Sequence, residues 1–317
     1  MLIVYTDAHQ AHNPPYEIYE GELEPYAEAA DRGEVIIDAL RRKKFGSVIS
    51  PQKFPLSHIY AIHQKQYVEF IKNRSAHLAD QDILYPSYFI TDTYAPIVAG
   101  TYDASVAAVN CALTGAQQVL DGSETVVYSL CRPPGHHAAH HTMGGYCYFN
   151  NAAIAAHYLS AHGRVAVLDI DFHHGNGTQD AFYDRSDVLY VSIHATPEER
   201  YPYSSGFAQE HGYGKGKGYN HNYPLPLGTD NAAYLKALHT ALQDVKKFKP
   251  DFLVVSAGFD TFSEDPIGGF TLTKEVYQEV GEKIHELAMP TLLVQEGGYN
   301  VQNLGQMVAN FLSGFVG

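Results

Sequence analysis

The sequence contains few cysteines, few basic residues and no long apolar run. Its three cysteines, Cys111, Cys131 and Cys147, show no CxxC spacing, which argues against a disulfide framework and favours a reducing compartment. Lys and Arg number 21 against 35 Asp and Glu, a formal net charge of −14 that disfavours binding to nucleic-acid phosphates. No run reaches the length of a membrane span, and the first residues lack the basic and apolar regions of a signal peptide. We therefore expect a soluble, cytoplasmic protein that binds neither nucleic acid nor membranes.

The residues that are present favour a folded α/β domain. Apolar residues make up 45% and charged residues 18% of the chain, so a sizeable core can form. Short apolar runs rich in β-branched residues are typical of parallel strands buried on both faces; they lie at 2–5, 126–130, 165–170, 188–193, 252–256 and 291–295. Helical patterns lie between them, at 28–44, 62–73, 101–120, 150–161, 231–247 and 273–287. We predict one domain over residues 1–317: an open, mostly parallel sheet flanked by helices on both faces.

Two segments follow neither pattern. Residues 74–100 contain Pro86, Pro96 and several aromatic residues without a clear period, and residues 196–222 are rich in Gly, Tyr and Pro. Long irregular segments inside a compact domain are usually functional or disordered. Because the second segment directly follows a predicted strand, we favour a functional role.

A candidate metal site follows two of the predicted strands. Asp171 and His173 come directly after the strand at 165–170, and positions two apart in an extended chain share one face. Asp260 follows the strand at 252–256, and ligands of open α/β sheets bind at the carboxyl ends of strands. One imidazole and two carboxylates leave coordination positions open for water and substrate; Zn²⁺ is the default ion and Fe²⁺ the alternative. The competing interpretation is that these residues only cap helices and line turns.

Two further motifs stand at strand ends. The run from Cys131 to His137, CRPPGHH, follows the strand at 126–130, and its adjacent histidines suit proton transfer near neutral pH. The run from Glu296 to Asn300, EGGYN, follows the strand at 291–295, and its phenol can donate a hydrogen bond to an oxyanion. A GGY sequence alone also occurs in ordinary turns. Because several such motifs stand at strand ends, we disfavour the interpretation that their residues only cap helices and line turns.

Taken together, these motifs resemble those of a known superfamily. RPPGHH, DIDFHHGNGTQDAFY, AGFD and EGGYN occur in that order between residues 131 and 300, and they resemble the arginase–deacetylase superfamily on its histone deacetylase-like side. The stretches YEIYEGEL at 16–23, DTFSEDPI at 260–267 and VAN at 308–310 are similar to those of bacterial acetylpolyamine amidohydrolases. The resemblance therefore covers nearly the whole chain.

This resemblance implies a metal-dependent amidohydrolase with a defined set of site residues. Zinc would be held by Asp171, His173 and Asp260. His137 would act as general base and acid beside His136, with Asp169 orienting His136 and Asn176 orienting His137, and Tyr299 would polarise the scissile carbonyl. The residues implied at the substrate tunnel are Gly145, Tyr146, Tyr201 and Ile267. The residues implied around a structural K⁺ are Asp169, Asp171, His173, Ser192 and Ile193.

The sequence departs from the polyamine enzymes in one region. Those enzymes carry an insertion before RPPGHH that forms a dimer and supplies acidic groups at the tunnel entrance, whereas residues 74–100 are shorter and aromatic here. The acid expected there aligns near Tyr94, and Asp92 is the nearest carboxylate. We expect a small cationic acetylated amine, such as an acetylpolyamine, as substrate. Two alternative functions stay open: an acetyl-lysine deacetylase acting on proteins or peptides, and a catalytically silent metal-binding sensor. For the assembly, a homodimer stays open.

Overall fold

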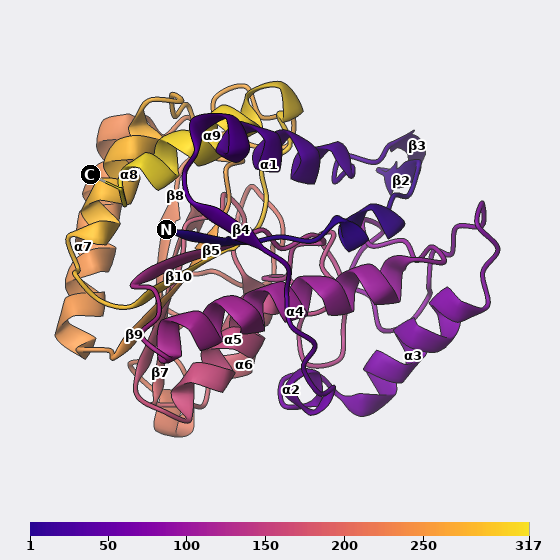
Figure 1. Ribbon diagram of the computed structural model, residues 1–317, viewed down its shortest axis with the longest axis horizontal. Helices are drawn as coiled ribbons and strands as arrows, with labels where there is room; N and C mark the ends of the chain where they lie inside the picture. The colour runs from indigo at the N-terminus through magenta and orange to yellow at the C-terminus, as the bar shows by residue number, and fades with distance from the viewer. Residues whose placement is uncertain (317) are drawn as a thin grey trace.

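An eight-stranded sheet forms the centre of the molecule. The computed structural model describes residues 1–316, and every pairing in this sheet is parallel, in the order β4-β1-β5-β10-β9-β6-β7-β8. The strands are β1 (Leu2–Val4), β4 (Ser47–Ile49), β5 (Val126–Ser129), β6 (Val165–Asp169), β7 (Val188–Ala195), β8 (Asn220–Leu225), β9 (Phe252–Ala257) and β10 (Thr291–Gln295). The predicted class, an open parallel sheet flanked by helices, is confirmed (Figure 1).

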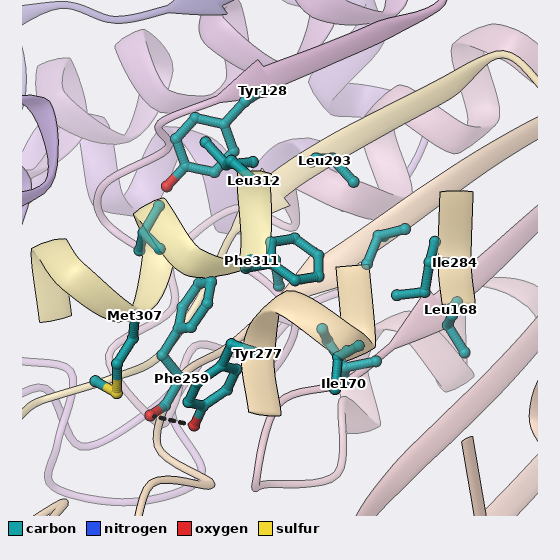
Figure 2. Packing of buried hydrophobic residues seen from close by; sticks show 14 of the residues in the cluster. Tyr128, Leu168, Ile170, Phe259, Tyr277, Ile284, Leu293, Met307, Phe311 and Leu312 are labelled. Atoms are coloured by element: carbon teal, nitrogen blue, oxygen red, sulfur yellow. Dashed lines mark hydrogen bonds between the residues drawn. The ribbon is translucent and has the colours of Figure 1, made fainter. Parts of the chain in front are cut away.

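Helices cover both faces of this sheet (Figure 1). They are α1 (Asp31–Lys43), α2 (Ser57–Tyr60), α3 (Lys65–Ala76), α4 (Thr101–Leu120), α5 (Asn151–Ser160), α6 (Asn176–Phe182), α7 (Asn231–Phe248), α8 (Val276–His285) and α9 (Val301–Ser313). Buried residues of α1, α7, α8 and α9 join one apolar core, and those of α2 to α6 join the other. Figure 2 shows the first core, where α8 and α9 pack Ile284 and Phe311 close to Leu168 and Leu293 of the sheet.

The continuous apolar strands follow from this two-sided cover. Because side chains of a strand alternate between faces, a strand covered on both faces needs apolar residues at every position. In β6, Val165 and Val167 belong to one core while Ala166 and Leu168 belong to the other. No helix in the described residues is long and apolar enough to cross a bilayer. The three cysteines are free and buried.

Several elements differ from the sequence prediction. The helix predicted at 62–73 is α3, at Lys65–Ala76, and α2, α6 and α9 were not predicted. Strand β8 begins in the last residues of the segment 196–222, which we interpreted as irregular, and extends beyond it to Leu225. Strand β4 has only three residues. A separate antiparallel hairpin, β2 (Tyr16–Tyr19) and β3 (Glu22–Pro25), was also missed. Its two-residue turn has positive φ at Glu20 (48°) and Gly21 (91°), as a tight hairpin turn of this kind requires.

The rest of the segment 74–100 forms no regular element. Beyond α3 it is held by isolated bridges that pair Leu84 with Ile97 and Ile90 with Met143. The second bridge ties this segment to the chain just after the tandem histidines. The aromatic segment therefore lies against the region that the motifs identify as functional.

Candidate active site

The sheet order brings the four sequence motifs together. Strands β5, β10, β9 and β6 are successive neighbours in the sheet, although β10 follows β5 by more than 160 residues in the chain. Each of these strands is followed by one motif: CRPPGHH, EGGYN, AGFD and DFHH, respectively. Because all the pairings are parallel, the motifs leave the same edge of the sheet.

The three predicted metal ligands converge at this edge. Donor atoms of Asp171, His173 and Asp260 all lie within 4.8 Å of one another. The Nδ1 atom of His173 lies 2.9 Å from Oδ2 of Asp260 and 3.5 Å from Oδ1 of Asp171. The two carboxylates are fully buried, and the His173 side chain keeps 11% exposure. The predicted residues are thus brought together, and one of them still reaches solvent.

The charges at this site fit a divalent cation. Burial, followed by the charge of Asp171, raises the pKa of Asp260 to about 7. Burial alone would lower the pKa of His173, but Asp171 and Asp260 outweigh it and raise that pKa to about 9. Two buried carboxylates at this separation repel each other, and a shared cation relieves the repulsion. The donor set of one nitrogen and two oxygens suits Zn²⁺ and also accepts Fe²⁺.

Two glycines allow the neighbouring loops to close on the donor set. A Cβ atom at Gly258 would lie 2.0 Å from Oδ2 of Asp171, and one at Gly297 would lie 2.6 Å from the same oxygen. The backbone N–H of Gly297 instead donates to this oxygen at 2.8 Å. The glycines of AGFD and EGGYN are therefore required by the close approach of backbone to carboxylate.

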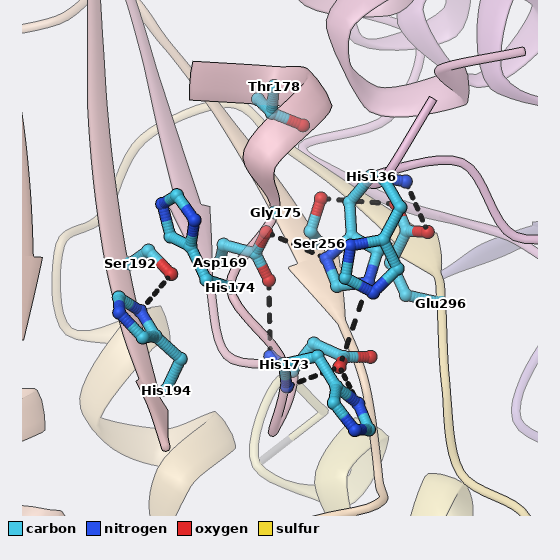
Figure 3. A network of polar contacts seen from close by, with 12 residues as sticks. His136, Asp169, His173, His174, Gly175, Thr178, Ser192, His194, Ser256 and Glu296 are labelled. Carbon is cyan, nitrogen blue, oxygen red and sulfur yellow. Dashed lines mark hydrogen bonds and ion pairs between the residues drawn. The ribbon is translucent and has the colours of Figure 1, made fainter. Parts of the chain in front are cut away.

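The tandem histidines have different environments. Nδ1 of His136 lies 3.1 Å from Oδ2 of Asp169 (Figure 3), and Nδ1 of His137 lies 2.7 Å from Oδ1 of Asn176. The two rings are 4.0 Å apart between centroids. The predicted partners, Asp169 and Asn176, are both in place. Because the amide oxygen of Asn176 only accepts, Nδ1 of His137 carries the hydrogen and Nε2 is the free acceptor.

These environments separate the protonation states of the two rings. Burial, followed by repulsion from His136 and His173, holds the pKa of His137 well below its ordinary value. Burial also disfavours charge on His136, but Asp171 and Asp169 outweigh it and raise the pKa of His136 to about 10. Around neutral pH, His137 is then a neutral proton acceptor beside a charged His136. This is the division of roles that the resemblance implies.

Tyr299 stands beside this group on a loop that Arg32 supports. The guanidinium of Arg32 lies 4.8 Å from the centre of the Tyr299 ring and donates to the carbonyl oxygens of Gly298 and Glu296, each at 2.6 Å. It also forms a 2.6 Å ion pair with buried Glu28. Burial raises the pKa of Tyr299 well above its usual value, so the phenol stays protonated and can donate. Sequence inspection missed Arg32 and Glu28, which belong to no motif.

Glu296 joins the EGGYN loop to the histidine loop. Its Oε2 accepts from the backbone N–H groups of Gly135 at 2.7 Å and His136 at 3.2 Å, and its Oε1 accepts from the Ser256 hydroxyl at 3.2 Å. Burial raises the pKa of Glu296 to about 7. The glutamate of the motif is therefore a structural link, a role that the sequence did not reveal.

The predicted substrate-binding residues lie beside His137 and Tyr299. The backbone of Gly145, at a φ of 51°, lies so close to His137 that a Cβ would come within 2.4 Å of its ring. The Tyr201 ring lies 4.8 Å from the ring of His137, and the Tyr146 ring lies 5.3 Å from that of Tyr299. Ile267 is partly buried and packs against the cluster that Tyr146 and Tyr299 form with Tyr26.

Asp92 ties the irregular segment to these residues. Its Oδ2 accepts from the Tyr201 hydroxyl at 2.7 Å and from the backbone N–H of Gly145 at 3.0 Å. Its Oδ1 accepts from the backbone N–H of Tyr94 at 2.8 Å. The carboxylate that the sequence offered in place of an acid at Tyr94 thus lies at the candidate site.

The residues predicted around K⁺ lie on β6 and β7 and in the loop after β6. Asp169 of β6 pairs in register with Ser192 of β7, and Ile193 follows on the same strand. The hydroxyl of Ser192 contacts Nδ1 of His194 at 2.7 Å (Figure 3). This ligand set stays a prediction.

The fold and the site together define a class of proteins. The model of the histone deacetylase domain family matches residues 26–315, so the chain belongs to this family. It is 43% identical to acetylpolyamine amidohydrolase 2 of Pseudomonas aeruginosa, over 100% of this chain and 99% of that one. It is 37% identical to the acetylpolyamine amidohydrolase of Mycoplana ramosa, over 100% of both chains. The predicted family is confirmed.

Solved structures agree with this placement. The crystal structure of acetylpolyamine aminohydrolase from Burkholderia pseudomallei has a TM-score of 0.94 at 36% identity, over 99% of this chain and 98% of that one. The HDA15 HD domain has a TM-score of 0.89 at 27% identity, over 100% and 91%. The alignment with the Pseudomonas protein runs over 342 positions against 317 residues here, so this chain lacks about 25 residues that the relative has.

Proposed function

We propose that the protein is a metal-dependent deacetylase that releases acetate from a small cationic acetylated amine, such as an acetylpolyamine. The observation that carries this proposal is the convergence of Asp171, His173 and Asp260 beside a neutral His137 and a protonated Tyr299. A donor set, a base and a hydrogen-bond donor are the groups that hydrolysis of an amide needs. The acetylpolyamine amidohydrolases among the relatives support the substrate class.

Asp171, His173 and Asp260 would hold Zn²⁺, with Fe²⁺ as the alternative ion. A cation bound there polarises the amide carbonyl and lowers the pKa of water. His137 then accepts a proton from the attacking water through Nε2, because Asn176 fixes its tautomer. Tyr299 donates a hydrogen bond to the carbonyl oxygen as negative charge develops on it. His137 finally delivers its proton to the departing amine, while Asp169 holds His136 as a charged neighbour.

Further parts of the proposal concern the surroundings of the enzyme. Asp169, Asp171, His173, Ser192 and Ile193 bind a structural K⁺, a role supported by the register of Asp169 with Ser192. The protein works in the cytoplasm and binds neither nucleic acid nor membranes, in keeping with its charge of −14. The proposal of a homodimer rests on the resemblance alone, and light scattering of the purified protein tests it.

One experiment decides between the proposed function and its rivals. The kcat/KM for acetylputrescine is compared with that for an acetyl-lysine peptide, and zinc and iron are measured on the same sample. A preference for acetylputrescine supports the proposal, whereas a strong preference for the peptide replaces it by a protein deacetylase. Bound metal without turnover of any acetylated amine would instead identify a silent sensor.

A further inference from the structure

Three polar groups meet at Gly175, the glycine that follows DFHH. A Cβ atom at this position would lie 2.3 Å from Oδ2 of Asp169, 2.5 Å from the hydroxyl oxygen of Tyr190 and 3.1 Å from Nδ1 of His136. Figure 3 shows Gly175 beside Asp169 and His136. Only glycine leaves room for these groups to come together. Tyr190 belongs to none of the sequence motifs, yet it joins the pair formed by Asp169 and His136.

Tyr190 reaches this place from the buried strand β7. This strand lies next to β6 in the sheet, and Tyr190 stands two residues before Ser192, which pairs in register with Asp169. The side chain of Tyr190 is 1% exposed and packs in the core that α2 to α6 form with the sheet. A side chain so enclosed does not contact a substrate, so it can act on the reaction only through its neighbours.

The Tyr190 hydroxyl donates toward two acceptors. Oδ2 of Asp169 lies 3.0 Å from it, and the carbonyl oxygen of Gly175 lies 3.1 Å from it. The same Oδ2 atom accepts from Nδ1 of His136 at 3.1 Å, while Oδ1 accepts from the N–H of Asp171 at 3.2 Å. Asp169 is fully buried, so bulk water does not replace the phenol on this oxygen. Without the phenol, the oxygen that holds His136 would lose one of its two donors.

The second acceptor belongs to the helix that orients the other histidine. Gly175 directly precedes α6, and its carbonyl oxygen also accepts from the N–H of Gln179 at 3.0 Å, in the first turn of this helix. Asn176 is the first residue of α6, and its side chain holds Nδ1 of His137. The phenol therefore contacts both the partner of His136 and the peptide that carries the partner of His137.

We propose that Tyr190 is a positioning residue for the hydrolysis: its hydroxyl fixes Asp169 and the start of α6, and through them the orientation of both histidines. This inference rests on the proposed function and adds the residue that ties the two histidine partners to each other. The reaction needs the His137 ring aimed at the attacking water with the charged His136 ring beside it, and a small displacement of a catalytic group costs much of its effect. Tyr190 itself acts only through Asp169 and Asn176.

Tyr190→Phe removes the hydroxyl and keeps the ring. The kcat for acetylputrescine per bound metal ion should fall roughly 10- to 100-fold, the usual cost of losing a group that orients an active-site side chain, while KM stays within about twofold. Saturating KCl keeps the proposed K⁺ site equally filled in every sample. Tyr67→Phe is the matched control, because it removes a buried phenol of the same core that donates to the carbonyl of Tyr148. This control should keep the wild-type kcat.

NMR of the metal-loaded protein without substrate distinguishes positioning from a merely structural role. The hydrogen-bonded ring N–H protons of His136 and His137 are assigned by their loss in His136→Ala and His137→Ala. In Tyr190→Phe both resonances should move, whereas Tyr67→Phe should leave both in place. A change that only lowers stability reduces the number of folded molecules and leaves these resonances where they are in the wild-type protein.

The two measurements also separate this inference from the proposed function. In an active deacetylase, unmoved histidine resonances in Tyr190→Phe would overturn the inference even if kcat falls, and an unchanged kcat would overturn it even if the resonances move. Resonances that move in a protein without turnover of any acetylated amine would support the orientation of both rings by Tyr190 and reject only the proposed function. Both readouts concern folded, metal-bound molecules, so partial unfolding of the variant cannot imitate the expected result.

Discussion

The loop that carries the Tyr299 phenol is held by Arg32, a charged residue far from the metal ligands in the sequence. Arg32 joins the carbonyls of Glu296 and Gly298, on either side of Gly297, to Glu28. The N–H of Tyr299 donates to Asp265 at 2.7 Å. Two charged side chains therefore fix a loop whose glycine at 298, with φ of 112°, gives it little rigidity of its own.

Tyr299→Phe should lower kcat roughly 10²-fold or more, because the variant loses a donor that acts on charge developed only in the transition state. KM and metal content should change little. Steady-state kinetics and metal analysis of one sample test this, with Tyr223→Phe on edge strand β8 as the control. An unchanged kcat would reject the assigned role of the phenol.

Arg32→Lys should lower kcat about tenfold with little change in KM, because an ammonium can pair with Glu28 but cannot reproduce the planar fork that reaches two carbonyls. Arg32→Met should be much less stable, by about 3–5 kcal/mol, since Arg132 alone then offsets the buried charge of Glu28. Thermal unfolding and kinetics of both variants distinguish the effects. Equal losses of stability in the two variants would contradict a positioning role.

The sequence predicted the residues whose signal is local. Asp171, His173 and Asp260 follow apolar strands, and the structure brings their donor atoms together. Arg32 carries no such signal, because it lies on an ordinary amphipathic helix. Arg32 finds its partner Gly298 at a separation of 266 residues, and no local pattern reports such a contact.

At the scale of elements, periodicity predicted the central strands and missed those at the margins. Strands β5, β6, β9 and β10 are apolar at nearly every position because helices cover both of their faces. Edge strands β4 and β8 are short or half exposed, so their sequences lack that pattern. Helix α9 did carry a signal, since Leu304, Met307 and Phe311 recur at helical spacing after the Asn300 cap. The sheet order depends on long-range packing, and the strand signals do not encode it.

His63, between α2 and α3, should make folding sensitive to acid. Its Nδ1–H donates to the Ala139 carbonyl at 2.8 Å, and its Nε2 accepts from the Asn150 N–H at 2.8 Å. Only the neutral ring satisfies both contacts, and burial lowers the pKa of His63 to about 3. Below pH ~6.5 the unfolded chain takes up a proton that the folded chain refuses, so this contribution to stability is lost as pH falls.

His63→Gln should therefore be less stable than the wild-type protein at pH ~7.5, and the difference should shrink by about 1.4 kcal/mol per pH unit below pH ~6.5. Urea unfolding between pH ~7.5 and ~5 measures the difference. His239→Gln, at an exposed position on α7, should follow the wild-type curve. A constant or widening gap between His63→Gln and the wild-type protein would show that His63 does not stay neutral in the fold.

At the scale of the whole molecule, the charge of −14 should draw a cationic substrate toward the site. Screening shortens the range of this attraction from about 20 Å at ~0.02 M salt to about 4 Å at ~0.5 M. The kcat/KM for acetylputrescine should accordingly fall several-fold over this range. The value for N-pentylacetamide, in which a methyl group replaces the ammonium, should stay level. NaCl is varied at constant KCl, so that the proposed K⁺ site remains equally filled.

The neutral amide is the control for this prediction, because it carries no charge for the field of the protein to act on. An equal decline for N-pentylacetamide would mean that salt acts on the enzyme itself, and electrostatic attraction of the substrate would be rejected.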